Sequence, residues 1–232
     1  MKLIISIVLT LVIAGAKANS LEAEVNSQIT GGNTDFKSQL FKIEHNHTFK
    51  EKYKISESSM YQYGESDNIR SLEKWNIKIR PEYLFTERTS IFLANALSAN
   101  RFSGISRMYT SDVGIAHSWL KSEKFELSNS IAYRYSKEKQ IDDTKISQSK
   151  GDIVILSKYK FKNLSEIKAK LTYLPNFTDS DDDNINANLD YISFLGKGFS
   201  LKIGYEWAYD EKPVAGKAKH DYTTLVGLIF KY

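Results

Sequence analysis

Apolar and polar side chains alternate along almost the entire chain, and this period of two residues constrains the fold more than any other feature. The range 199–210 reads FSLKIGYEWAYD, in which every odd position is apolar or aromatic, and the ranges 166–173 and 184–191 follow the same rule. Such a period is that of a pleated strand with one apolar and one polar face. Beyond the N-terminal segment no convincing 3.6-residue stripe occurs. We therefore expect an all-β protein.

Runs of this kind divide the chain into about twelve strands, with ten as the alternative. They follow one another without a linker or a second domain, so neighbouring strands can pair as hairpins. The fold that we expect is a closed antiparallel up-and-down transmembrane β-barrel. The expected strands are 20–30, 37–49, 52–63, 72–83, 90–99, 104–119, 124–136, 151–161, 165–174, 184–195, 199–210 and 221–232.

Connections that follow an even-numbered strand differ in length from those that follow an odd-numbered strand. Those after the even strands are short: 50–51, 85–89, 120–123, 162–164 and 196–198. Most of the others are longer and more polar: 64–71, 137–150, 178–183 and 211–220. Short turns at one end and long loops at the other are typical of outer-membrane barrels. A soluble β-sandwich, the alternative fold, gives no reason for such sorting.

Aromatic residues mark both ends of the apolar faces. Their spacing of 8 or 10 residues corresponds to roughly 20–25 Å along the axis of a tilted barrel, which matches the apolar band of an outer membrane. Ring side chains favour the two membrane interfaces. The predicted interface residues are Tyr53, Tyr61, Trp75, Tyr83, Tyr109, Trp119, Phe125, Tyr133, Phe199, Trp207, Tyr222 and Tyr232.

The N-terminus has the features of a secretory signal peptide. Lys2 precedes an apolar run over 3–14, and Ala16-Lys17-Ala18 offers small residues for cleavage after Ala18. An uncleaved membrane anchor is the alternative, but the run is short for a bilayer of about 30 Å. We expect residues 1–18 to be a signal peptide and residues 19–232 to be a single barrel domain in the outer membrane of a Gram-negative bacterium.

The composition excludes several classes of protein. The chain has no Cys, which excludes a disulfide scaffold, a Cys-ligated zinc site and a thiol nucleophile. Its 32 Lys and Arg nearly balance its 28 Asp and Glu, which disfavours a nucleic-acid partner.

The last strand alternates down to Tyr232, a pattern that barrel-insertion machinery reads. The expected partners are therefore this machinery, outer-membrane lipid and lipopolysaccharide, with small solutes as a further option.

Three stretches resemble a known bacterial family, the salt-induced outer membrane proteins, whose shared domain has no assigned function. They are Gly32-Asn33-Thr34-Asp35, Asn100-Arg101-Phe102-Ser103-Gly104 and the tail from Leu201 onward, with Tyr205, Tyr209, Pro213, Lys217, Asp221 and Thr223. The chain departs from the pattern at Asn100, where Asp is usual, and at Ala94, Ala96 and Ser98, where charged inward residues are usual. The resemblance implies an outer-membrane barrel and neither a reaction nor a ligand.

The polar faces of the strands are expected to line the lumen of this barrel. Their bases and acids are nearly equal in number, which favours ion pairs across a narrow or occluded interior over a strongly ion-selective channel. The predicted lumen-lining charges are Lys42, Glu44, Lys78, Arg80, Glu82, Asp112, Arg134, Lys158, Lys168, Lys170, Asp190, Lys202 and Glu206.

Catalytic and metal sites are not expected. His45, His47 and His117 share the outward parity, so no His–Ser–acid group can be assembled from them. The acidic run 179–183 could bind Ca²⁺ or bridge lipopolysaccharide through divalent ions, but it lacks the spaced ligands and the Gly of a calcium loop. A solvated acidic loop is the simpler interpretation. We expect no catalytic residue, no cofactor and no metal.

Three functions stay open from the sequence. The first is a barrel with an envelope role in salt or osmotic adaptation and a narrow or occluded lumen. The second is a passive diffusion pore for small solutes. The third, an outer-membrane lipid hydrolase, is disfavoured by the placement of the His residues.

Overall fold

The computed structural model describes residues 20–30, 36–162, 164–213 and 218–232, so the predicted signal peptide lies outside the described residues. Twelve strands are formed by these residues, which confirms the larger of the two expected numbers. The strands are β1 (Ser20–Thr30), β2 (Phe36–Phe49), β3 (Tyr53–Ser66), β4 (Ile69–Leu84), β5 (Thr89–Asn100), β6 (Ile105–Lys121), β7 (Phe125–Gln140), β8 (Lys145–Lys160), β9 (Glu166–Leu174), β10 (Asn184–Gly196), β11 (Phe199–Asp210) and β12 (His220–Lys231).

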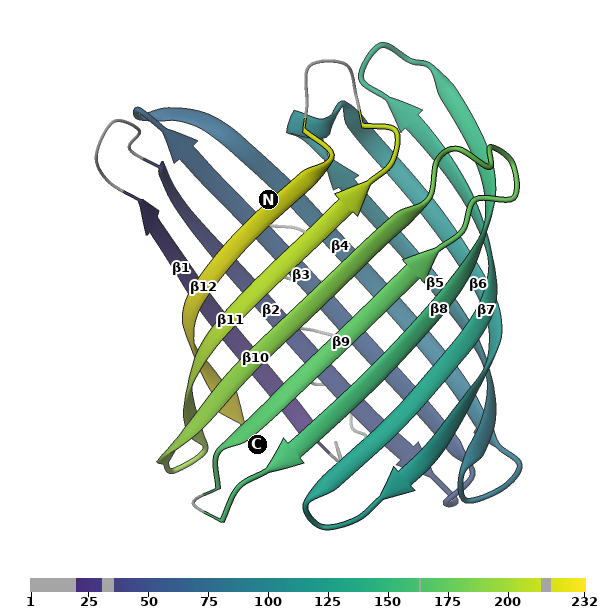
Figure 1. Ribbon diagram of the computed structural model, residues 1–232, viewed down its shortest axis with the longest axis vertical. Helices are drawn as coiled ribbons and strands as arrows, with labels where there is room; N and C mark the ends of the chain where they lie inside the picture. Colours follow the sequence, from purple (N-terminus) through teal and green to yellow (C-terminus); the bar gives the residue numbers. More distant parts are fainter. Residues whose placement is uncertain (1–19, 31–35, 163, 214–217) are drawn as a thin grey trace.

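Each strand pairs antiparallel with its neighbours in sequence, and β1 pairs with β12 to close the barrel (Figure 1). At this seam Leu21 and Tyr232 exchange two backbone hydrogen bonds of 2.9 Å. A short 3-10 turn, Arg101–Ser103, joins β5 to β6. In the described part of the chain, no helix has the length and apolar character needed to cross a bilayer.

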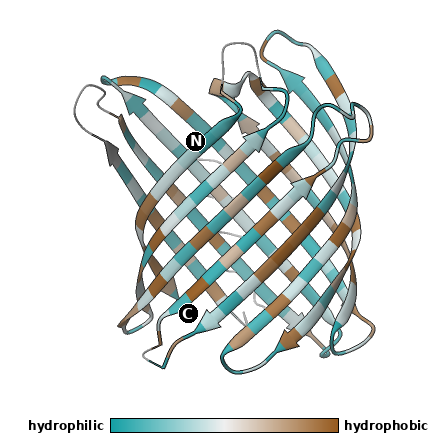
Figure 2. Ribbon diagram, viewed as in Figure 1, coloured by the Kyte–Doolittle hydropathy of each residue, from teal (hydrophilic) through white to brown (hydrophobic). Residues whose placement is uncertain are grey.

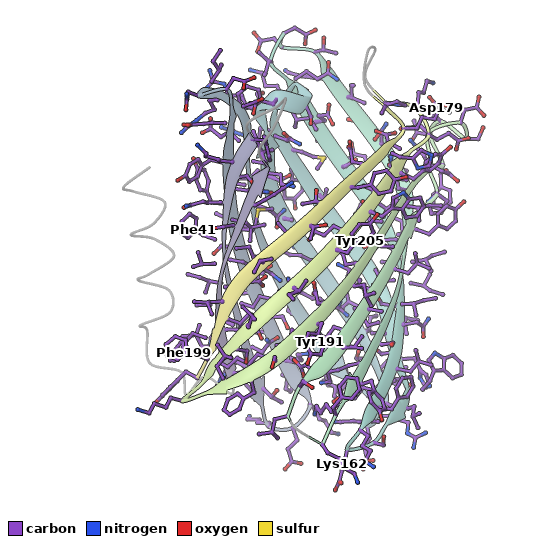
Figure 3. All side chains as sticks on the ribbon, turned by 60° about the vertical axis from the view of Figure 1, so that its left-hand side comes forward. Phe41, Lys162, Asp179, Tyr191, Phe199 and Tyr205 are labelled. Atoms are coloured by element: carbon purple, nitrogen blue, oxygen red, sulfur yellow. The ribbon has the colours of Figure 1, made fainter. Side chains whose placement is uncertain are left out.

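The strands present their apolar side chains to the outside and their polar side chains to the lumen. Along each strand hydrophobic and hydrophilic positions alternate (Figure 2). Phe41, Tyr191 and Tyr205 lie on the outer surface (Figure 3) and are between 41% and 45% exposed. Buried hydrophobic residues are few, and the cluster formed by Phe92, Ala94 and Ala132 lies on the lumen side of β5 and β7. This inverted arrangement is that of a transmembrane β-barrel.

Two of the four long loops expected from the sequence are instead extensions of strands. β3 and β4 continue to a two-residue turn at Asp67 and Asn68, whose φ angles are +52° and +63°. β7 and β8 likewise continue to a four-residue turn at 141–144. These extensions carry polar residues on both faces, so they lack the alternation from which strands are recognised. The connections 175–183 and 211–219 are the longer ones, and both lie at the end opposite the even-strand turns.

We name the end of the barrel with the even-strand turns the turn end, and the opposite end the loop end. Several aromatics that the sequence assigns to the membrane interfaces form facing pairs near both ends of the barrel. Tyr53 lies opposite Tyr83 and, eight residues toward the loop end, Tyr61 lies opposite Trp75. Two further strands repeat this arrangement, with Phe199 near the turn end and Trp207 opposite Tyr222 near the loop end.

The remaining aromatics of the set also lie on the outer face, and several find polar partners there. The Tyr109 hydroxyl donates to Asn95 Oδ1 at 2.6 Å, and Trp119 Nε1 donates to Asn129 Oδ1 at 2.7 Å. Phe125 lies opposite Tyr159, and Tyr133 stacks on Phe177 with 6.4 Å between ring centroids. Tyr232 is 88% exposed at the turn end.

Arginine substitution tests which face of each strand meets lipid. Leu171 and Ile203 are 43% and 47% exposed on the outer face, whereas Thr172 lines the lumen. We expect Leu171→Arg and Ile203→Arg to lower the free energy of unfolding by about 2–4 kcal/mol, because a charge would enter hydrocarbon. We expect Thr172→Arg to cost little. Urea unfolding of the barrel refolded in lipid vesicles measures both, and equal losses at Leu171 and Thr172 would contradict the assigned faces.

Candidate functional site in the barrel lumen

The lumen contains a cavity of about 1510 Å³ that reaches from one end of the barrel to the other. Its lining includes Glu44 and Glu126 near the turn end and Phe36 and Asp210 near the loop end. The wall between them is largely polar, with apolar side chains such as Leu156 at intervals. Because polar and charged side chains line this cavity together, we take it as the candidate site.

Eleven of the thirteen predicted lumen charges line this cavity directly: Lys42, Glu44, Lys78, Arg80, Arg134, Lys158, Lys168, Lys170, Asp190, Lys202 and Glu206. The other two, Glu82 and Asp112, also face inward, since each forms an ion pair with a lining arginine. The polar positions of the strands therefore form the inner wall of the barrel.

Arg134 on β7 holds two carboxylates of the neighbouring strands. Its Nε and Nη2 donate to the two oxygens of Asp112 on β6 at 2.7 and 2.9 Å, and Nη2 also donates to Asp152 Oδ2 on β8 at 2.7 Å. Asp112 is only 2% exposed. A buried carboxylate is stable when a charged donor saturates it in this fork geometry. Asp152 Oδ1 accepts no hydrogen bond from any described residue.

Lys202 on β11 forms a second cluster at the seam. Its Nζ lies 2.7 Å from Glu24 Oε1 on β1 and 3.3 Å from Asp190 Oδ1 on β10. Asn26, which is 1% exposed, donates to the same Glu24 oxygen at 2.7 Å. Sequence reasoning missed Glu24 and Asn26 as site residues, although their even positions in the strand 20–30 give them inward parity.

Glycines provide the space for this seam cluster. A Cβ on Gly227 would lie 2.0 Å from Asn26 Oδ1 and 2.4 Å from the Val25 carbonyl oxygen. A Cβ on Gly204 would lie 2.7 Å from Asp190 Oδ1. β11 and β12 therefore carry no side chain at the points where the buried polar side chains pass over them.

Arg80 forms a third cluster, on the wall of β4 and β5. Its guanidinium carbon lies 3.7 Å from the centroid of the Phe92 ring, and Nη2 lies 3.2 Å from Glu82 Oε2. Ser90 Oγ donates to the other oxygen of Glu82 at 2.6 Å. Phe92 in turn lies over Gly114, where a Cβ would come within 2.7 Å of its ring. This cluster keeps Arg80 folded against the wall.

Shorter pairs lie toward the turn end. Lys42 Nζ lies 2.8 Å from Glu44 Oε1 on the same strand. Lys158 Nζ on β8 lies 2.7 Å from Glu126 Oε2 on the adjacent strand β7. Lys168 lies 3.3 Å from Glu166 on the same strand. Among the described residues, Lys78, Lys170 and Glu206 have no ion pair.

The acidic run at the loop end is folded by its own carboxylates. Asp182 Oδ2 accepts hydrogen bonds from Asn176 Nδ2 at 2.8 Å and Gln148 Nε2 at 3.0 Å. Asp183 accepts from the Tyr173 hydroxyl at 2.5 Å and the Asn176 amide at 2.8 Å. These bonds tie the connection 175–183 to itself, to β8 through Gln148 and to β9 through Tyr173, while Asp181 stays exposed.

The histidines lie on the outer face or at the loop end. His45 Nδ1 is 3.2 Å from Glu57 Oε2, and His117 Nδ1 is 2.9 Å from Thr89 Oγ1. His47 packs edge-on against Phe49, and His220 stacks on Trp207. Within the described ranges, no three His, Cys, Asp or Glu side chains are grouped so that they could hold a metal ion.

Alanine substitution at two glycines tests the packing of the seam cluster. We expect Gly227→Ala to lower the free energy of unfolding by about 1–3 kcal/mol, because the new methyl group would meet backbone as well as Asn26. The methyl group of Gly204→Ala would meet only side-chain atoms at close range, Asp190 Oδ1 at 2.7 Å and Lys202 Cε at 3.2 Å. We expect it too to lower the free energy of unfolding, and Asp190→Ala in the same chain to restore most of that loss. Asn26→Ala should not rescue Gly227→Ala. Urea unfolding in vesicles measures all variants, and rescue at both sites would refute the backbone contact.

The acidic connection should loosen at low pH. The hydrogen bond from Tyr173 lowers the pKa of Asp183, and the bond from Lys212 lowers the pKa of Asp179. Carboxylates with a lowered pKa stabilise the folded loop above their ordinary pKa of about 3.9, and this stabilisation is lost as the pH falls through the lowered value. Hydrogen exchange of the Asn176 amide, corrected for intrinsic rates, should stay slow from pH 7 to about 5 and accelerate below about pH 4. Unchanged protection at pH 2 would exclude a role for these carboxylates.

Known structures share the architecture at low sequence identity. An outer-membrane channel from Pseudomonas putida F1 has a TM-score of 0.62 at 9% identity, covering 94% of this chain and 97% of that chain. The translocator domain of the autotransporter NalP from Neisseria meningitidis has a TM-score of 0.56 at 9% identity, with 98% and 93% covered. The NanC porin has a TM-score of 0.56 at 11% identity, with 91% and 100% covered. At these identities the likeness shows the fold of outer-membrane barrels.

No curated protein matches the chain. A family does match it, over nearly the whole barrel. Residues 23–232 fit the family described as protein of unknown function, DUF481, and the chain belongs to that family.

Proposed function

We propose that the protein is an integral outer-membrane barrel that forms a narrow aqueous channel for small polar solutes. The observation that carries this proposal is the cavity of about 1510 Å³, whose lining residues come from both ends of the barrel. An eight-stranded barrel is filled by its own side chains, whereas a sixteen-stranded porin leaves a wide channel. Twelve strands lie between these limits, so we infer a bore suited to small solutes.

The packing of the long inward side chains also supports this proposal. Arg134 is held against the wall by carboxylates of the two adjacent strands, and Arg80 is held by Glu82 on its own strand and by the Phe92 ring. Lys202 on β11 reaches over β12 to Glu24 on β1. Side chains fixed in this way leave the centre of the lumen to water. The sequence favoured ion pairs that cross the lumen and occlude it. The pairs of Arg134 join neighbouring strands, whereas Lys202–Glu24 spans one strand and Lys231–Glu166, near the turn end, spans two.

A closed barrel with a role in salt or osmotic adaptation is the second candidate. It is favoured by side chains that join non-adjacent strands, such as Lys231 on β12, whose Nζ lies 3.1 Å from Glu166 Oε1 on β9. Side chains that extend from distant strands narrow the passage between them. Measurement of conductance separates this candidate from the first.

Export and insertion belong to the same proposal. We infer that residues 1–18 are removed as a signal peptide, that outer-membrane lipid and lipopolysaccharide surround the apolar band, and that the insertion machinery binds the last strand. The support for the last step is the alternation of β12, in which Tyr222, Val226 and Leu228 are exposed while Leu225 and Ile229 are buried.

Single-channel recording in a planar bilayer tests the channel. We expect the purified barrel to give stable openings of small conductance, well below that of a sixteen-stranded porin. Absence of openings, with the barrel shown to be inserted by its heat-modifiable migration on gels, would favour the closed barrel.

A matched pair of variants links conductance to the lumen. Leu156 faces the cavity and is 45% exposed, whereas its neighbour Ile155 faces outward and is 43% exposed. We expect Leu156→Trp to lower the conductance, because the indole would fill part of the bore, and Ile155→Trp to leave it unchanged. Equal conductance for both variants would contradict a path through this lumen.

A further inference from the structure

Lys78 projects into the lumen from β4 with no acidic residue directly opposite it on either adjacent strand. Its cross-strand partners are Ser58 on β3 and Ala96 on β5, neither of which can neutralise it. Ala96 is one of the positions at which the chain departs from the family resemblance, where a charged inward residue is usual. The strand register therefore leaves this ammonium group without a counter-ion on either adjacent strand.

Lys170 is in the same situation on β9, on a different part of the wall. Its cross-strand partners are Leu156 on β8 and Asn188 on β10. Both lysines line the same cavity, and they interact electrostatically with each other. In the described part of the chain neither has an ion pair or a hydrogen bond.

The carboxylates that face these lysines are already bonded to other cations. Lys78 interacts with Asp112 and Asp152, which Arg134 holds at 2.7 Å each. Lys170 interacts with Asp152 and with Glu44, which Lys42 holds at 2.8 Å. The groups that interact here carry one more positive than negative charge: Lys42, Lys78, Arg134 and Lys170 against Glu44, Asp112 and Asp152.

We propose that Lys78 and Lys170 together form an anion-binding site within the lumen, which takes a small solute bearing a phosphate or carboxylate group. A single anion placed between the two ammonium groups balances the local excess charge and accepts a charge-assisted hydrogen bond from each. Two mutually repelling lysines that share one cavity are stabilised by such an anion. This inference rests on the proposed channel function and extends it, since it adds a position in the lumen at which anions bind.

Binding of inorganic phosphate to the folded barrel in detergent micelles tests the site without requiring conduction. We expect saturable binding that is competed by small carboxylates such as citrate. Lys78→Gln and Lys170→Gln should each weaken phosphate affinity, and the double variant should weaken it by about tenfold or more, because two charge-assisted hydrogen bonds are lost. Calorimetry or broadening of the phosphate ³¹P resonance reports the affinity.

Two further variants separate the site from general lumen charge. Lys168→Gln removes a lysine two residues from Lys170 that already pairs with Glu166, and it should leave phosphate affinity nearly unchanged. Ala96→Glu keeps both lysines and places a carboxylate directly beside Lys78, so it should reduce the affinity as Lys78→Gln does. Retention of the gel shift between heated and unheated samples confirms that each variant is folded.

The outcomes distinguish this site from the channel itself. Phosphate binding by a barrel that does not conduct would overturn the channel and support the site. Conduction without phosphate binding, or binding that the double variant retains in full, would overturn the site. In a conducting barrel we further expect the double variant to shift the reversal potential in a salt gradient toward cation preference, and Lys168→Gln to shift it less.

Discussion

A bilayer offers no hydrogen-bond partners, so every backbone N–H and C=O within it must be satisfied by the protein itself. In this chain the requirement is met by a ring of strand pairs that has no free edge, because β1 and β12 pair with each other. The other features follow from that closure. The outward side chains must suit lipid, the inward ones must suit water, and the alternation of the sequence is the result.

The interior then poses an electrostatic problem, since long charged side chains share a confined space. The barrel solves it locally, by pairing acids and bases of adjacent or next-but-one strands along the wall. Arg134 with Asp112 and Asp152, and Lys202 with Glu24 and Asp190, are the clearest cases. Glycines at 204 and 227 allow the second of these clusters to lie close to the backbone. Where the register supplies no acid, as beside Lys78 and Lys170, the wall keeps an exposed positive charge.

The alternation of side chains was sufficient to predict a barrel of about twelve strands, with ten left open, and to assign an inward and an outward face to each strand. This works because successive side chains of a strand point to opposite faces of the sheet. It failed at the hairpins around 67–68 and 141–144, where polar residues occupy both faces and the strand continues in water. The pairing of particular charges also could not be predicted. Arg134 reaches Asp152 diagonally, and Lys202 reaches Glu24 across the seam, so both contacts depend on register and on residues far apart in the sequence.

The seam that closes the barrel joins the first and last described strands, and this has a kinetic consequence. Pairs such as Val25 with Leu228 bring together residues from opposite ends of the chain. Contacts of such high sequence separation form late, since the entropy of closing the intervening loop must be overcome first. Every other pair of neighbouring strands can begin to form at the hairpin connection that joins the two strands, but no such connection joins β1 to β12. The barrel is therefore closed only after β12 has reached β1.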